Sequence, residues 1–113
     1  MKIFNKYHNR KTKIDGFTFD SKKEATRYCE LKILAERGDI HDILLQPKYE
    51  LQPHFKHNGK MIRKIEYIAD FSYFDNNGVH IVEDVKGMKT DVFKIKEKMF
   101  KYKYPEIEFR IIR

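Results

Sequence analysis

The sequence predicts a mixed α/β (α+β) fold in one domain. A short β-hairpin is followed by a helix, three strands, a second helix and a last strand. Three observations support this prediction. A chain of 113 residues holds one core built from a sheet and two helices. Apolar residues recur at helical spacing in some segments and gather with β-branched residues in others. Glycine-containing turn signals separate these segments.

Residues 1–20 are expected to form a basic arm that ends in a hairpin. Asp15-Gly16 lies between two short strand-like runs, and both residue types tolerate the positive φ that a tight turn needs. The cations of this arm are Lys2, Lys6, Arg10, Lys11 and Lys13.

A first helix is predicted between Ser21, which can cap its start, and Gly38, which is well placed to end it. The apolar face of this helix consists of Ala25, Tyr28, Leu31, Leu34 and Ala35. Glu24 leans toward that face and has two interpretations, which do not exclude each other. It can form a capping box with Ser21, or it can add a metal ligand through a water.

Three strands are expected next, over residues 40–51, 65–74 and 79–86. Pro47 interrupts the first of them, which indicates an edge position or a bulge. The turn signals between the strands, Asn58-Gly59 and Asn77-Gly78, predict that neighbouring strands run antiparallel.

A basic amphipathic helix is predicted over residues 90–104, and Pro105 stops it. Its apolar stripe consists of Phe93, Met99, Phe100 and Tyr104. Residues 108–112 read as a short last strand. Because this strand follows a helix, we expect it to enter the sheet by a crossover connection.

The charge balance is basic, with 24 Lys and Arg against 17 Asp and Glu and a formal net charge of +7. The cations concentrate in the N-terminal arm and in residues 86–103, where only Asp91 and Glu97 oppose them. This distribution favours a surface that binds a polyanion over a merely solvated lysine face. The lysines expected to contact nucleic acid are Lys11, Lys13, Lys89, Lys94, Lys96 and Lys98.

Cys29 is the only cysteine, so no disulfide can form within the chain and no zinc site of paired cysteines exists. The first residues are charged, so no signal peptide is expected. No run of about 18 apolar residues occurs, so no membrane segment is expected either. We therefore expect a cytoplasmic protein.

Strand parity predicts a cluster of two acids and a lysine. Side chains alternate faces along a strand, so Asp84 and Lys86 point the same way while Glu83 points away. If the strands on either side of Asn77-Gly78 pair, Asp70 lies near Asp84. Two carboxylates then converge with one lysine.

Such a cluster suits phosphodiester hydrolysis. Two carboxylates can hold Mg²⁺, which takes oxygen ligands and keeps several waters. The ion polarises the phosphate and lowers the pKa of a bound water, and the lysine stabilises the developing charge. The alternative interpretation is structural: Asp84 forms an ion pair with a lysine on a solvated sheet face.

This arrangement resembles the PD-(D/E)XK nuclease superfamily, with Glu24 on a first helix, Asp70 on a strand and Asp84-Val85-Lys86 on the next strand. The element order is similar to that superfamily's restriction-endonuclease-like core. The segments 15–24, 67–71 and 82–87 look like a family of small phage and prophage proteins, formerly of unknown function, that is placed in this superfamily.

The resemblance implies a DNA endonuclease that uses Mg²⁺, with Mn²⁺ as a substitute, in the cytoplasm of a phage's host. It implies that Asp70, Asp84, Lys86 and Glu24 are catalytic. Asp70, Asp84, Val85 and Glu24 are implied to hold the metal. Related nucleases also use a polar residue on the following helix. The candidates for it here are Thr90, Lys94 and Lys96.

Two features depart from the family pattern. Ala69 stands where the motif has its proline, but that position is not a ligand. Glu83 directly precedes Asp84, and a bulge could exchange the two acids.

Three functions remain open. The first is an endonuclease for branched DNA, such as a Holliday junction or a flap. Because each chain has one site and two strands must be cut, a homodimer is expected. The second is a basic nucleic-acid-binding or replication and recombination accessory protein with structural acids, and the third is a nuclease-like protein that binds a host protein. The joint presence of Asp70, Asp84 and Lys86 favours the first.

Overall fold

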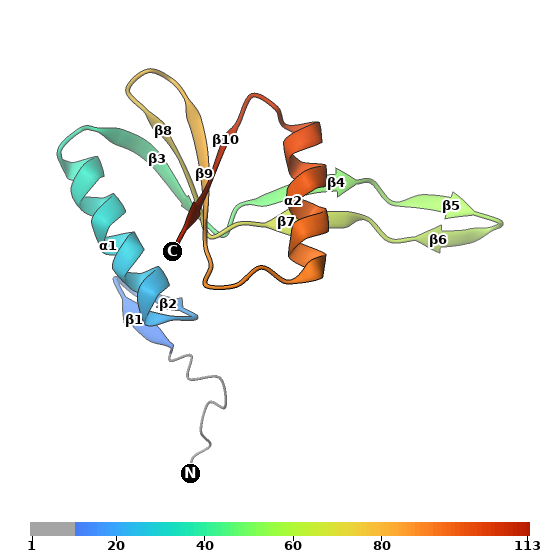
Figure 1. Cartoon of the computed structure of the whole chain (residues 1–113), viewed down its shortest axis with the longest axis horizontal. Coiled ribbons are helices and arrows are strands. Elements are labelled where there is room, and N and C mark those ends of the chain that lie inside the picture. The colour runs from blue at the N-terminus through green and yellow to red at the C-terminus, as the bar shows by residue number, and fades with distance from the viewer. Residues whose placement is uncertain (1–10) are drawn as a thin grey trace, which may run out of the picture. The chain divides into compact units, whose positions relative to one another are not determined.

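The structure is a computed structural model that describes residues 11–113, so the predicted arm cations Lys2, Lys6 and Arg10 lie outside the described residues. The described chain is mixed α+β, with two helices and ten strands (Figure 1). It divides between Ile40 and His41 into two compact units. Neither helix in the described range has the length and apolar character needed to cross a membrane. The single domain expected for residues 1–113 stays a prediction.

The first unit contains the predicted hairpin and first helix. β1 (Thr12–Ile14) and β2 (Phe17–Phe19) pair antiparallel, and Asp15 and Gly16 turn between them with φ angles of 55° and 83°. α1 (Lys22–Glu36) begins after its N-cap Ser21. Gly38 follows its end with a φ of 82°, a left-handed conformation that glycine adopts without steric cost. Both elements are confirmed.

Asp15 ties the hairpin turn to α1. One of its carboxylate oxygens accepts hydrogen bonds from the Tyr28 hydroxyl at 3.0 Å and from Lys32 Nζ at 2.5 Å. The bonds from Lys32 and Tyr28 lower the pKa of Asp15. Tyr28 also packs against Phe19, with ring centroids 5.0 Å apart. The hydrogen bonds of Asp15 and the packing of Phe19 on Tyr28 together join the hairpin to α1.

The second unit is built on a four-stranded sheet in the order β10-β9-β8-β3. Its strands are β3 (Ile40–Leu45), β8 (Phe71–Asp75), β9 (His80–Val85) and β10 (Glu108–Ile112). β8 and β9 are antiparallel, and β10 lies parallel to β9 after the crossover through α2 (Asp91–Lys103). Thr90 caps α2 by accepting a hydrogen bond from the Phe93 N–H. The predicted second helix and crossover strand are confirmed.

The prediction of one continuous strand over residues 40–51 and another over residues 65–74 is wrong. Each is two strands in two different sheets, because β4 (Lys48–Gln52) and β7 (Ile65–Ile68) pair with each other outside the four-stranded sheet. The first break falls at Gln46, whose φ of 51° turns the chain. Pro47 follows and has no N–H to continue a strand ladder. Pro47 therefore lies between β3 and β4. The prediction that it occupies an edge position or a bulge within one strand is wrong.

Both chain segments bend at the same place. The Gln46 N–H donates to the Asp70 carbonyl at 2.9 Å, and the Ala69 N–H donates to the Pro47 carbonyl at 3.1 Å. These two hydrogen bonds keep the segments paired while they leave one sheet and enter the other. We call residues 46–47 and 69–70 the ribbon bend.

Beyond β4 and β7 the ribbon continues into a hairpin that the sequence did not predict, although Asn58-Gly59 was recognised as a turn. β5 (Phe55–His57) and β6 (Lys60–Ile62) pair antiparallel around this turn, with φ angles of 49° and 78° at Asn58 and Gly59. Figure 1 shows β4 and β7 passing alongside α2, and the β5–β6 hairpin extending past the helix.

The core of the second unit lies between α2, the β4–β7 pair and β9. Its buried residues are Leu51, Tyr67, Ala69, Val82, Phe93 and Phe100. Phe100 is completely buried, and its ring lies 5.1 to 5.6 Å from four other aromatic rings. The apolar stripe predicted for the second helix is therefore confirmed as the contact that fixes α2.

We expect Phe100→Ala to destabilise the protein by about 3–5 kcal/mol, because it leaves a cavity that the surrounding rings cannot fill. Tyr102→Ala is the matched control on the same helix, since Tyr102 is 90% exposed, and it should change stability by less than about 0.5 kcal/mol. Urea unfolding followed by circular dichroism measures both. Equal effects of the two substitutions would contradict this account of the core.

Candidate functional site

The ribbon bend positions Asp70 at the start of β8. If the register of β8 on β9 continued, Ala69 would lie opposite Val85. The chain has already turned into the other sheet at Ala69, whose N–H donates to Pro47. The Asp70 carboxylate replaces the missing strand partner, and its Oδ2 accepts a hydrogen bond from the Val85 N–H at 2.7 Å. Asp70 is therefore fixed beside the end of β9, as the sequence predicted.

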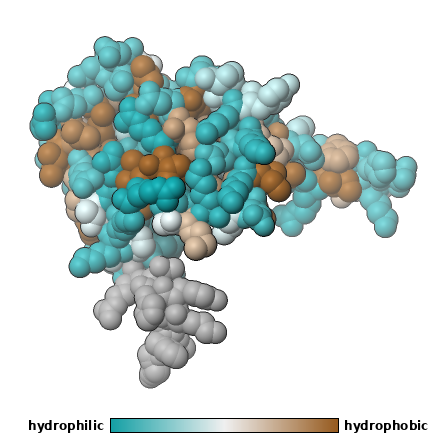
Figure 2. Space-filling model, viewed as in Figure 1, coloured by the Kyte–Doolittle hydropathy of each residue, from teal (hydrophilic) through white to brown (hydrophobic). Residues whose placement is uncertain are grey.

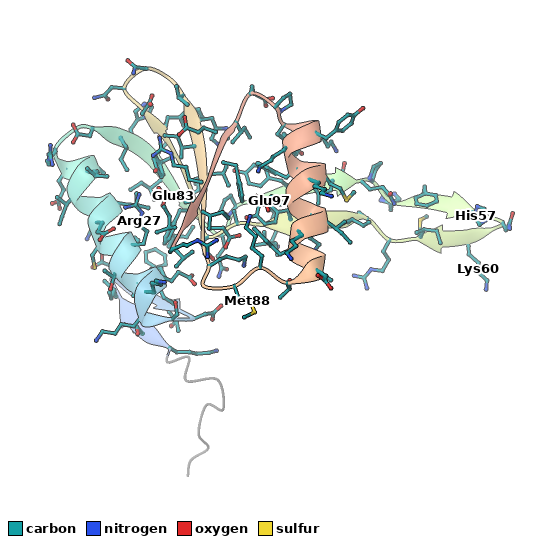
Figure 3. The ribbon with its side chains drawn as sticks, in the orientation of Figure 1. Arg27, His57, Lys60, Glu83, Met88 and Glu97 are labelled. Atoms are coloured by element: carbon teal, nitrogen blue, oxygen red, sulfur yellow. The ribbon has the colours of Figure 1, made fainter. Side chains whose placement is uncertain are left out.

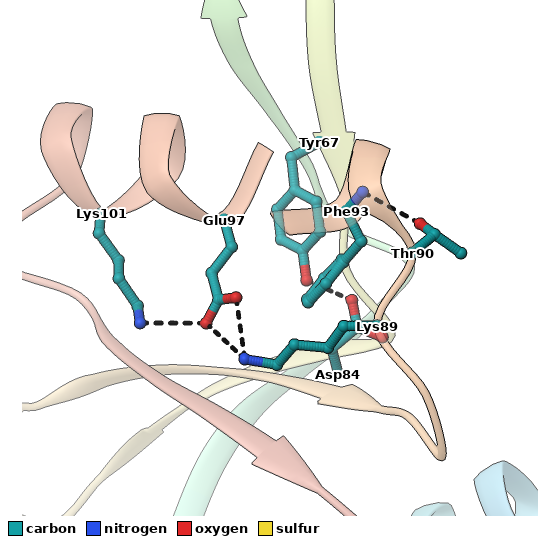
Figure 4. Close-up of polar contacts among 7 residues, drawn as sticks. All are labelled: Tyr67, Asp84, Lys89, Thr90, Phe93, Glu97 and Lys101. Carbon is teal, nitrogen blue, oxygen red and sulfur yellow. Dashed lines mark hydrogen bonds and ion pairs between the residues drawn. The ribbon is translucent and has the colours of Figure 1, made fainter. Parts of the chain in front are cut away.

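Asp84 and Lys86 point the same way from the end of β9, which confirms the parity argument. Lys86 Nζ lies 3.3 Å from Asp84 Oδ1 and 4.6 Å from the centre of the Phe93 ring. Asp84 is only 3% exposed. Its second oxygen accepts a hydrogen bond from the Tyr67 hydroxyl. Figure 4 shows Tyr67 and Phe93 beside this carboxylate.

Glu83 belongs to the opposite face of β9. It is fully buried and accepts a hydrogen bond from the Tyr73 hydroxyl, whereas Asp84 accepts one from Tyr67. Figure 3 labels Glu83 within the sheet. No bulge exchanges the two acids, because β9 keeps an unbroken register with β10 across both of them, from Ile81 to Val85. Asp84 is thus the acid that shares a face with Lys86.

The Tyr67 hydroxyl lies close enough to three acids for their charges to change its pKa. Burial raises the pKa of its hydroxyl, and the hydrogen bond to Asp84 raises it further. The negative charges of Asp84, Asp70 and Glu97 act in the same direction. Tyr67 consequently stays protonated and serves as a donor to Asp84. Sequence reasoning missed this residue, although a tyrosine in a buried strand needs a partner for its hydroxyl.

Glu97 is another buried carboxylate, and it comes from α2 (Figure 4). It accepts hydrogen bonds from Lys89 Nζ at 3.0 and 3.3 Å and from Lys101 Nζ at 3.0 Å. Burial acts to raise the pKa of Glu97. The hydrogen bonds and charges of Lys101 and Lys89 lower it by more, so its pKa lies below the usual value. The sequence counted Glu97 only as a charge opposing the lysines.

The lysines predicted to contact nucleic acid fall into three groups. Lys89 is held by Glu97, as described above. On α2, Lys94 and Lys98 are exposed and Lys96 is half-buried. Lys11 and Lys13 are exposed in the first unit. Their contact with nucleic acid stays a prediction.

Glu24, the helix-borne acid of the prediction, lies in the first unit at the start of α1 and is 8% exposed. Its backbone N–H donates to Ser21 Oγ at 3.0 Å, which is one half of the expected capping box. The structure thus brings Asp70, Asp84, Val85 and Lys86 together at the end of β9, in the second unit.

The donors at the end of β9 fit a hard cation. Carboxylate and carbonyl oxygens are the ligands that Mg²⁺ prefers. Each carboxylate also has a partner that orients it, since Tyr67 donates to Asp84 and the Val85 N–H donates to Asp70. Within residues 11–113, no three His, Cys, Asp or Glu side chains converge as a cage for a metal. Mg²⁺ does not need such a cage, because one or two carboxylates plus substrate phosphates hold it in many enzymes.

These features define a mixed α+β protein with a buried carboxylate–lysine pair and a second carboxylate at the ends of adjacent strands. Over residues 4–113 the chain matches the family described as "Protein of unknown function (DUF1064)", and it belongs to that family. No curated protein and no solved structure matches it.

We expect Tyr67→Phe to destabilise the protein by about 1–3 kcal/mol, because the buried Asp84 carboxylate loses its hydroxyl donor while the aromatic ring stays in place. Tyr102→Phe removes an exposed hydroxyl and is the control. The free energy of unfolding in urea is the readout. An unchanged value for Tyr67→Phe would show that this hydrogen bond does not stabilise the fold.

Glu97→Gln tests the buried ion pairs of α2 through the pH dependence of stability. Because the folded pKa is lowered, its contribution is fully present above the ordinary value of 4.5 and is lost as the pH falls through the folded pKa. We therefore expect the substitution to cost stability near pH 7, and the cost to shrink below about pH 4. Urea unfolding across this pH range measures it. A cost that does not change with pH would contradict a charged Glu97.

Proposed function

We propose that this protein is a metal-dependent DNA endonuclease of the PD-(D/E)XK type. One observation carries the proposal. Asp84 and Lys86 lie 3.3 Å apart on one face of β9, and the Asp70 carboxylate is bonded to the N–H of Val85 between them. An acid pair can hold the metal ion, and a lysine beside it can stabilise the charge that develops in phosphodiester hydrolysis.

The sheet supports the finer proposal of a restriction-endonuclease-like core. β8 and β9 are antiparallel neighbours, and α2 connects β9 to the parallel strand β10. This is the order of strand, strand, helix and strand that the resemblance implied. The acids then stand at the end of β9 and at the start of the strand next to it.

In the proposed site, Asp70, Asp84 and the Val85 carbonyl oxygen hold Mg²⁺. A metal-binding role for Glu24 stays a prediction. When bound, the ion polarises a phosphodiester and makes a coordinated water more acidic. Lys86 places a positive charge beside the carboxylates, where it can stabilise negative charge that develops on the phosphate. Its side chain is 28% exposed, so it is accessible to a substrate while Phe93 restricts its position.

The proposed substrate is DNA, branched as in a four-way junction or a flap. A homodimer would supply two sites for two strands. The proposed place of action is the cytoplasm of a bacterium that carries the phage or prophage.

A non-catalytic nucleic-acid-binding protein is the second candidate, and one observation favours it. Asp84 is 3% exposed, and both of its oxygens already have partners in Tyr67 and Lys86. A buried, fully paired carboxylate can be purely structural. The same carboxylate can serve as a metal ligand only if Lys86 moves aside or the metal shares its oxygens, so activity must be measured.

Cleavage of a labelled DNA panel separates the two functions. The panel contains linear duplex, single strand, flap and four-way junction, each with Mg²⁺, with Mn²⁺ and with EDTA. We expect metal-dependent cutting by the wild type and a loss of at least about 100-fold in Asp84→Asn, which keeps the shape of the side chain but removes the ligand charge. Lys86→Ala should slow cutting without abolishing metal binding, which calorimetry with Mn²⁺ measures.

Glu83→Gln is the matched control, because it changes the same charge one residue away on the opposite face. It should retain cleavage as long as circular dichroism shows that it folds. Salt-sensitive DNA binding without any cutting would favour the non-catalytic candidate. Equal loss of cutting in Asp84→Asn and Glu83→Gln would contradict the assignment of the site to one face of β9.

A further inference from the structure

The β5–β6 hairpin is an element without a role in the site described above. It forms a two-stranded sheet of its own, and residues 53–64 are all exposed. Figure 3 labels His57 and Lys60 at its tip, beyond the end of the β4–β7 pair. Two paired strands by themselves are only marginally stable in water. Its exposure suggests that it contacts another molecule.

The charge of the hairpin is one-sided. Residues 53–64 contain four cations and no acid, and the cations are Lys56, Lys60, Arg63 and Lys64. Within the described chain, only Lys64 among them has a carboxylate partner, Glu66 at 3.4 Å. Three unpaired cations on a narrow ribbon repel one another, and an anionic ligand would relieve that repulsion.

A groove of about 870 Å³ lies at the base of the hairpin, between β6, β7 and α2. Its apolar lining includes Met61, Ile68, Val92 and Ile95, each at least half exposed. The cations Arg63, Lys64 and Lys96 line the same groove, together with Glu66, which pairs with Lys64. Figure 2 shows hydrophilic residues at the tip of the hairpin and apolar residues closer to its base. Cations from the hairpin and from α2 thus converge on one surface.

The cations and the apolar side chains of this surface together indicate the kind of ligand that it fits. A sugar–phosphate backbone presents anionic phosphates for the cations and deoxyribose faces for the apolar lining. A two-stranded ribbon also fits the major groove of duplex DNA. A second copy of this chain is disfavoured as the occupant, because it would bring a net charge of +7 against the same cations.

We propose that the β5–β6 hairpin, together with the groove beside α2, binds the backbone of duplex DNA. Lys56 and Lys60 contact phosphates at the far end of the hairpin, and Arg63 and Lys96 contact them at its base. The proposal goes beyond the proposed endonuclease, because it requires binding and not cleavage.

Fluorescence anisotropy of a labelled duplex in EDTA tests the proposal without any cleavage. Lys56→Ala/Lys60→Ala removes two cations from the hairpin. Lys22→Ala/Arg37→Ala removes two cations from the ends of α1 and is the matched control. For the hairpin variant we expect a loss of about 10-fold or more in affinity. The slope of log K against log salt should fall by about 2, since each phosphate contact contributes about 0.9. The control should stay within about 2-fold of the wild type.

Equal losses in the two variants would show that net charge alone drives binding, and would overturn the proposal. It would also be overturned if the hairpin variant bound like the wild type, or if the wild type did not bind duplex at low salt. Circular dichroism confirms that both variants fold, as expected for exposed side chains. Selective loss in the hairpin variant supports the proposal even if no DNA is ever cut, whereas cleavage with equal binding losses would support the endonuclease and reject the hairpin.

Discussion

The second unit depends on the ribbon bend, where two chain segments leave one sheet together and enter another. Two hydrogen bonds hold the bend, between Gln46 and Asp70 and between Ala69 and Pro47. Val85 pairs with Ile112 of β10, but the bend deprives it of a partner on the β8 side, and the Asp70 carboxylate takes that place. An acid is therefore fixed at the end of β9 because the backbone there has an N–H to satisfy.

The second unit also buries three carboxylates, those of Asp84, Glu83 and Glu97, and each of them has its own donors. Tyr67 and Lys86 bond to Asp84, Tyr73 bonds to Glu83, and two lysines hold Glu97. Burying an acid is costly unless hydrogen bonds and opposite charges compensate. Tyr67 lies 17 residues from Asp84, and Tyr73 lies 10 residues from Glu83. The hydroxyl donors of these two acids are therefore in place only when the strands have assembled.

The ribbon bend also links the two proposals. On one side of it the chain enters β8 and supplies Asp70 to the candidate site. On the other side it runs through β4 and β7 past α2 and ends in the β5–β6 hairpin (Figure 1). The same change of sheet thus positions a carboxylate and directs a basic ribbon outward. α2 serves both regions, since Phe93 contacts Lys86 and Lys96 lines the groove.

The sequence by itself determined the features that depend on near neighbours. Periodicity and capping residues located both helices, Asp15-Gly16 located the first hairpin, and strand parity placed Asp84 and Lys86 on one face. Tertiary structure decided where the long strands break, because the bend depends on hydrogen bonds between residues more than twenty positions apart. It also selected the partners of the buried acids. Tyr67 and Asp84 are 17 residues apart, and only the assembled sheet and helix bring the hydroxyl to the carboxylate.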